Sequence, residues 1–137
     1  MENLDEKRDN LSRSLQNLKS QGLRVAKVVD FTYEGDTIDR VGHGTQISSV
    51  VASVDEDCPG IAPDAELYVL KVFTSKRESY TSWFLDALNF VLDNDIDIIN
   101  LSNGSSDFMD APFSDKLNEL TAKGVIIVSA IGNEGPF

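Results

Sequence analysis

The sequence predicts an α/β fold built on a parallel sheet with helices on both faces. From residue 23 onward, short runs rich in Val and Ile alternate with longer segments of helical period. Strands that alternate with helices require crossover connections, and such connections give parallel strands. The runs are apolar throughout rather than alternating, which is typical of strands covered on both faces. In sheets of this kind, ligands bind where the carboxyl ends of the strands meet the following loops.

The elements follow one another in a regular order. We expect strands at 23–29, 66–73, 96–101 and 125–130, and helices at 42–53, 79–92 and 113–123. The segment 79–92 shows the clearest helical pattern, because its apolar residues fall on one face: Trp83, Phe84, Ala87, Leu88, Val91 and Leu92. Leucines at positions 4, 11, 15 and 18 predict a further helix over 4–20, which Gly22 ends. We therefore expect an N-terminal helical segment at 1–22 and a main domain at 23–137.

Composition excludes several classes of protein. The 137 residues include 12 Lys and Arg against 23 Asp and Glu, and the net charge of −11 argues against a nucleic-acid partner. No apolar run approaches the roughly 20 residues that span a bilayer, so we expect no membrane segment in this chain. The N-terminus lacks the pattern of a secretory signal peptide. The single cysteine, Cys58, excludes an internal disulfide.

Polar residues gather where the predicted strands end. Asp30 follows the first strand, residues 102–106 follow the third, and residues 132–135 follow the fourth. His43 stands at the start of a predicted helix between two glycines, which allow a close approach of other groups. A lone histidine is more often structural than catalytic, yet this placement suits a general base that faces a cleft.

Four segments of the chain resemble the ordered signatures of the subtilisin-like serine proteases. They are VGHGT at 41–45, GIAPDAEL at 60–67, NLS at 100–102 and SAIGNEGP at 129–136. Within that family, SYTSWFLDA at 79–87 and DFMD at 107–110 look most like the site-1 protease branch. The resemblance covers residues 23–137 and implies a subtilisin-like fold of which this chain holds the N-terminal part.

The resemblance implies a role for each matching residue. His43 would be the general base that takes a proton from a serine hydroxyl, and Asn133 would donate to the oxyanion. Ser102, Asn103, Gly104 and Ser105 would form the strand edge along which a substrate peptide binds. The family usually has a second glycine where Ser105 stands, so a side chain there could narrow the cleft. Read without the resemblance, Asn133 is a turn residue and 102–105 a polar loop.

Two departures concern the other members of the catalytic triad. No serine in the chain stands in the Gly-Thr-Ser context of the family's nucleophile, so we expect these 137 residues to be inactive alone. Asp30 is either the orienting carboxylate on a shortened loop, or part of a later stretch that remains after the true aspartate was deleted with its loop. We favour the deletion, because residues 31–42 resemble the stretch just before the family histidine.

These observations predict a serine endopeptidase of the subtilisin type, active in site-1-protease-like processing of proproteins. The alternative is a catalytically dead remnant that binds peptides or a partner protein, and a third is an unrelated α/β binding protein. We expect a polypeptide substrate. The acidic segment 55–57 is either a solvated turn, which is the more common case, or an acidic rim that attracts basic residues near the cleavage site. No cofactor is evident, although the complete family domain could bind calcium; the run 93–97 lacks the pattern of an EF-hand. By resemblance, the protein would belong to the secretory pathway of the ER and Golgi.

Overall fold

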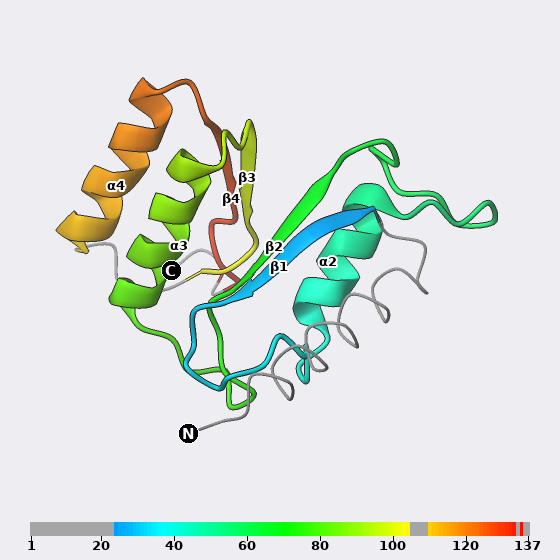
Figure 1. Ribbon diagram of the computed structural model, residues 1–137, viewed down its shortest axis with the longest axis horizontal. Coiled ribbons are helices and arrows are strands. Elements are labelled where there is room, and N and C mark those ends of the chain that lie inside the picture. Colours follow the sequence, from blue (N-terminus) through cyan, green and yellow to red (C-terminus); the bar gives the residue numbers. More distant parts are fainter. Residues whose placement is uncertain (1–23, 105–109, 134, 136–137) are drawn as a thin grey trace. The chain divides into compact units, whose positions relative to one another are not determined.

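The computed structural model describes residues 24–104, 110–133 and 135 of the chain. The chain divides into two compact units, Met1–Ser79 and Tyr80–Phe137. The helix expected at 4–20 lies outside the described residues, as does Ser105. The two units are described one after the other, and both contain a pair of parallel strands joined through a helix (Figure 1).

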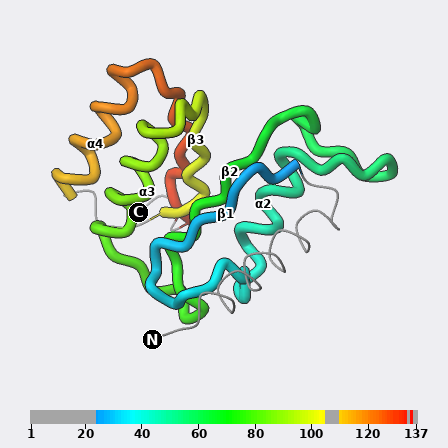
Figure 2. The backbone as a smooth tube through the Cα atoms, viewed as in Figure 1, coloured from blue at the N-terminus to red at the C-terminus, as the bar shows by residue number. Residues whose placement is uncertain are grey.

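The described part of the first unit contains a strand, a helix and a second strand. Strand β1 spans Val25–Asp30, helix α2 spans His43–Ala52 and strand β2 spans Leu67–Lys71. The strands pair in parallel, and Asp30 stands opposite Lys71 at their carboxyl ends. Figure 2 follows the chain from β1 through a long loop into α2 and back to β2. A small apolar core is formed by Val25, Val28, Leu67 and Val69.

The carboxyl end of α2 is closed by residues 60–62. Their amides donate in turn to the carbonyl oxygens of Ser53, Val50 and Val51, at 2.8, 3.1 and 2.7 Å. This contact requires Gly60, because a Cβ at that position would lie 2.5 Å from the Ser53 nitrogen and 2.6 Å from that of Ala52. The last carbonyls of the helix, which have no partner within it, are satisfied in this way.

The second unit holds two helices and two strands. Helix α3 spans Thr81–Asp93, strand β3 Ile98–Leu101, helix α4 Ala111–Ala122 and strand β4 Ile126–Ser129. Strands β3 and β4 pair in parallel. At the start of α4, Asp110 is the N-cap, and its carboxylate accepts from the Phe113 amide at 3.1 Å and from the Thr81 hydroxyl of α3. The two helices also meet through Phe84 and Phe113, whose rings pack edge to face.

Only one face of the β3–β4 pair is buried. Ile99 and Leu101 are each 9% exposed, whereas Ile98, Ile126 and Val128 on the other face are between 53% and 59% exposed. Helices α3 and α4 lie on the same side of these strands (Figure 1). The sequence predicts strands covered on both faces, and in this unit the described helices cover one.

The predicted α/β class is confirmed. Each predicted strand and helix within the described residues is present, and both strand pairs are parallel. The observed boundaries differ from the predicted ones by no more than two residues. The periodicity of the apolar residues is sufficient to predict these strands and helices, because each element buries its apolar side locally.

Candidate active site

Asp30 binds its own loop. One oxygen of its carboxylate accepts hydrogen bonds from the Thr32 amide at 2.9 Å and from the Thr32 hydroxyl, and the other accepts from the Gly35 amide at 3.1 Å. Among the residues that the structure describes, no hydrogen bond joins Asp30 to His43. The geometry is that of an aspartate that closes a turn after a strand, and both of its oxygens are engaged there.

The loop from Phe31 to Gly42 is tied to the end of β2 by a group of charges. Lys71 Nζ lies 2.7 Å from Glu34 Oε2 and 3.6 Å from Asp36 Oδ1. Glu34 also accepts from the amide and hydroxyl of Ser75, at 3.1 and 2.7 Å. Hydrogen bonds from Lys71 and then Ser75 lower the pKa of Glu34 from 4.5 to about 2. The carboxylate is therefore charged at neutral pH and links the loop to the second strand.

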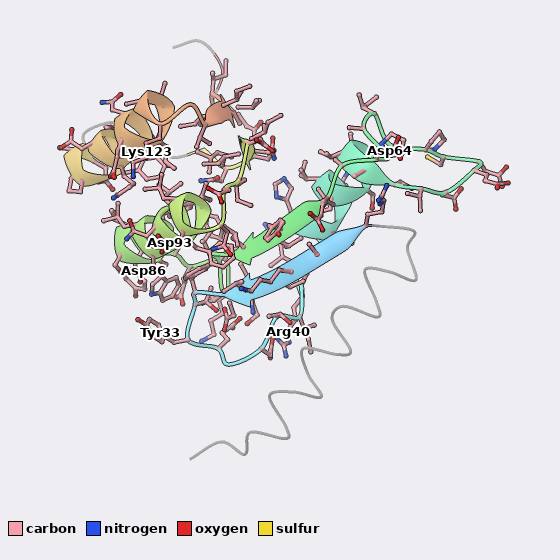
Figure 3. All side chains as sticks on the ribbon, turned by 45° about the horizontal axis from the view of Figure 1, so that its top comes forward. Tyr33, Arg40, Asp64, Asp86, Asp93 and Lys123 are labelled. Carbon is pink, nitrogen blue, oxygen red and sulfur yellow. The ribbon has the colours of Figure 1, made fainter. Side chains whose placement is uncertain are left out.

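Arg40 extends this group along the loop. Its guanidinium binds both oxygens of Asp36, at 2.9 and 2.7 Å. These hydrogen bonds lower the pKa of Asp36 and raise that of Arg40. Figure 3 shows Arg40 on the loop that leads from β1 to α2. A two-point contact of this kind restricts both side chains more than a single contact does.

His43 is the first residue of α2 and is exposed. The N-cap before it is Gly42, with a φ of 84°, in the left-handed region that favours glycine. The N-cap has no side chain to bind the free amides of the first turn. Among the described residues, no hydrogen bond reaches the His43 imidazole, and the backbone of this turn fixes the direction of its Cα–Cβ bond.

Asp39 takes the place of the missing cap. One of its oxygens accepts from the amides of Val41 and Gly42, at 3.1 and 2.7 Å. The other accepts from the amide and hydroxyl of Thr45, at 2.9 and 2.8 Å. Burial favours the neutral acid, but these hydrogen bonds outweigh it and lower the pKa of Asp39. An anion is thus held at the N-terminus of α2, where the helix dipole favours it.

In the second unit, the loops after β3 and β4 lie against each other. The Ala130 amide donates to the Leu101 carbonyl at 3.0 Å and so extends the pairing of the strands. Beyond it, a Cβ on Gly104 would lie 2.9 Å from the Gly132 Cα. This close approach brings the segment of Ser102 and Asn103 beside the loop that carries Asn133.

The structure thus places the predicted site residues in two groups. Asp30 and His43 belong to the first unit, without a hydrogen bond between them among the described residues. The predicted substrate segment and Asn133 belong to the second unit, where their loops are in contact. Asn133 is exposed, and Ser102 accepts from the side chain of Asn100 at 2.7 Å.

Two interactions of the loop before α2 are not among the sequence predictions. Asp39 was not singled out, although an aspartate shortly before a helix start is a familiar capping signal. The link from Glu34 to Lys71 joins residues 37 positions apart, and nothing in the local sequence indicates it.

The described residues contain no group of three or more His, Cys, Asp or Glu side chains that could hold a metal ion. None of the helices within the described part of the chain is long and apolar enough to cross a membrane.

Comparison with known proteins identifies the family. The sequence model of the Subtilase family, Peptidase_S8, matches residues 4–137. The chain therefore belongs to the subtilase family, whose members are serine endopeptidases.

Several curated relatives are similar to this chain. It is 54% identical over 113 residues to the human membrane-bound transcription factor site-1 protease, which is 82% of this chain and 11% of that protein. It is 45% identical over 114 residues to the Arabidopsis thaliana subtilisin-like protease SBT6.1, again covering 11% of the relative. Subtilisin E of Bacillus subtilis is 29% identical over 99 residues, 26% of its length. The chain thus spans about a tenth of the length of the first two relatives, and its predicted likeness to the site-1 protease branch is confirmed.

Proposed function

We propose that this chain supplies the general base, the substrate-binding strand and the oxyanion donor of a serine endopeptidase. His43 accepts the proton of a serine hydroxyl, and Asn133 donates to the oxygen on which negative charge develops. Residues 102–105 pair with the main chain of a polypeptide substrate. The observation that carries this proposal is the contact of Gly104 with Gly132, because it sets the substrate segment beside the loop of the oxyanion donor.

The proposal assigns no role in the triad to Asp30. Its carboxylate oxygens accept hydrogen bonds from Thr32 and Gly35, which supports the reading in which the true aspartate was deleted with its loop. The nucleophile of the proposed enzyme is a serine that is not among these 137 residues. We propose that residues 1–22 are an N-terminal segment and residues 23–137 part of the peptidase domain, which does not hydrolyse peptides by itself.

The substrate and location follow by similarity. The relatives include a protease whose name describes it as membrane-bound. We place this protein in the secretory pathway, acting in processing of proproteins with basic residues near the cleavage site. Support for the basic preference comes from the exposed acidic segment Asp55–Asp57 and the net charge of −11.

The first test is chemical. Purified residues 1–137 should neither turn over fluorogenic peptides nor react with a fluorophosphonate probe, because the probe requires an activated serine. Labelling of a serine within the chain would overturn this part of the proposal.

The second test reads the gene on both sides of this sequence. A Gly-Thr-Ser segment downstream and an Asp-Thr-Gly segment upstream would support a longer, active enzyme. In the protein that includes them, Asn133→Ala should lower kcat by about 10²–10³ with little change in KM, as is typical of an oxyanion donor. Asn118→Ala, on the exposed side of α4, is the control. Absence of both segments would instead favour the alternative, a remnant that binds peptides without cleaving them.

A further inference from the structure

We infer that Asp39 is a positioning residue for His43, and that it sets the direction of the imidazole by holding both ends of the turn that carries it. The inference deepens the proposed function, since it rests on His43 as the general base. It assigns the task to a carboxylate whose hydrogen bonds in the described structure go to the neighbours of His43 and not to the imidazole.

The Asp39 carboxylate accepts hydrogen bonds from backbone amides on both sides of His43. The carboxylate of Asp39 binds Val41 and Gly42 before His43, and Thr45 after it. A Cβ on Gly44 would lie 3.5 Å from Asp39 Oδ2, so the carboxylate lies directly against this turn. His43 therefore lies between the residues whose amides Asp39 binds.

A carboxylate from outside the helix is needed here because the N-cap residue is a glycine. A Ser, Thr, Asp or Asn at that position would bind the amide of the third helical residue. Here Gly42 provides the left-handed conformation but no side-chain acceptor. Asp39 binds the third helical amide, that of Thr45, from outside the helix, and adds the Thr45 hydroxyl.

The loop segment that carries Asp39 is itself held in place by hydrogen bonds. The neighbours of Asp39 on both sides bind Asp36, through the Ile38 amide at 3.0 Å and the Arg40 guanidinium. Lys71 of β2 in turn binds the Asp36 carbonyl at 3.2 Å. The carboxylate is therefore anchored to the strand pair, and the first turn of α2 is anchored to the carboxylate.

The chain offers an unambiguous probe, because His43 is its only histidine. The experiment measures the Hα–Hβ couplings of His43 and the exchange rate of the Thr45 amide by NMR on the whole chain. In Asp39→Ala, we expect the couplings to move toward rotamer-averaged values. The Thr45 amide should exchange about fivefold faster, the effect expected when a helix loses an N-cap.

Two further comparisons keep the test decisive. Thr45→Val removes the hydroxyl and should shift the His43 couplings in the same direction as Asp39→Ala. Thr45→Ser keeps a hydroxyl and should give the couplings of the wild type. This pair tests the inference even if Asp39→Ala fails to fold. Asp55→Ala is the matched control, because Asp55 also accepts two amides, those of Asp57 and Cys58 at 2.9 and 3.0 Å, in an exposed turn. It should leave His43 unchanged.

Unchanged His43 couplings in a folded Asp39→Ala chain, or in Thr45→Val, would overturn the inference, as would an equal change in Asp55→Ala. None of these measurements depends on proteolysis. Failure of the endopeptidase proposal would therefore leave the couplings as expected, and failure of this inference would leave the assignment of His43 as the base untouched.

Discussion

Two aspartates, one at the end of β1 and one in the loop that follows it, show how single residues acquire different tasks. Asp30 binds Thr32 and Gly35 and closes the turn that follows β1. Asp39 binds both sides of the turn that carries His43. Both are acceptors of backbone amides, and only the path of the chain decides which amides they meet.

Glycine at position 60 is required by a close backbone approach. Gly60→Ala should lower the free energy of unfolding by about 1–3 kcal/mol, because the added Cβ would overlap the backbone of Ala52 and Ser53 at the end of α2. The midpoint of urea unfolding measures the effect.

Gly44→Ala is the control for this prediction. The added Cβ would make an ordinary contact at 3.5 Å, and alanine is the better helix former, so stability should stay equal or rise by up to about 1 kcal/mol. Equal losses for both variants would show that the close approach at Gly60 is not the cause.

At the scale of elements, the loop between β1 and α2 is held by charge rather than by an apolar core. The Lys71 ammonium, with 12% of its side chain exposed, lies between Glu34 and Asp36, with side chains 23% and 14% exposed. Partly buried pairs of this kind are screened less by salt than exposed ones. The loop depends on the ionised form of its carboxylates.

The pH dependence of stability should report this link. The pKa of Glu34 is depressed from 4.5 to about 2 in the folded chain, so its contribution is complete above pH 4.5 and is lost as the pH falls toward 2. Glu34→Gln should therefore be less stable than the wild type at pH 7, and the difference should shrink between pH 4.5 and 2. Chemical unfolding at several pH values measures it.

The exposed Glu66 supplies the comparison. Glu66→Gln should differ from the wild type by a small amount that does not follow this pH window. A Glu34→Gln difference that stayed constant down to pH 2 would contradict the link to Lys71.

At the scale of the whole molecule, two properties act in opposite directions. The net charge of −11 favours solubility through repulsion between molecules. The open face of the β3–β4 pair carries Ile98, Ile126 and Val128, each more than half exposed. Exposed apolar groups on a sheet promote self-association. Repulsion between the negatively charged chains limits the self-association that this face would otherwise cause.

A double substitution tests that balance. Ile126→Thr with Val128→Thr should reduce binding of a hydrophobic dye such as ANS and self-association in high salt, because threonine keeps the strand propensity and removes apolar surface. Light scattering and dye fluorescence measure the outcome.

The buried face gives the matched control. Ile99→Thr, at a residue 9% exposed, should lower the stability without reducing dye binding, since it places a hydroxyl in the core. Equal effects on the two faces would refute the one-sided burial of the pair.

Much of the fold was accessible from the sequence because its signals are local. The apolar face of α3 follows from the spacing of Trp83, Ala87 and Val91, and all three are buried. The start of α2 at His43 follows from the glycines around it. A run of Val and Ile does not say which of its faces a helix covers, so only the structure shows that Ile99 and Leu101 of β3 are buried while Ile98 is exposed.

The sequence by itself determined the family, the order of the strands and helices, and the residues that the family's chemistry would use. Only the tertiary structure decided that Asp30 binds its own turn, that Asp39 holds the turn of His43, and that Gly104 meets Gly132. The reason is that periodicity and motifs are properties of neighbouring residues. The partners of a carboxylate, or the approach of two loops, depend on where a folded chain brings distant backbone groups within about 3 Å of each other.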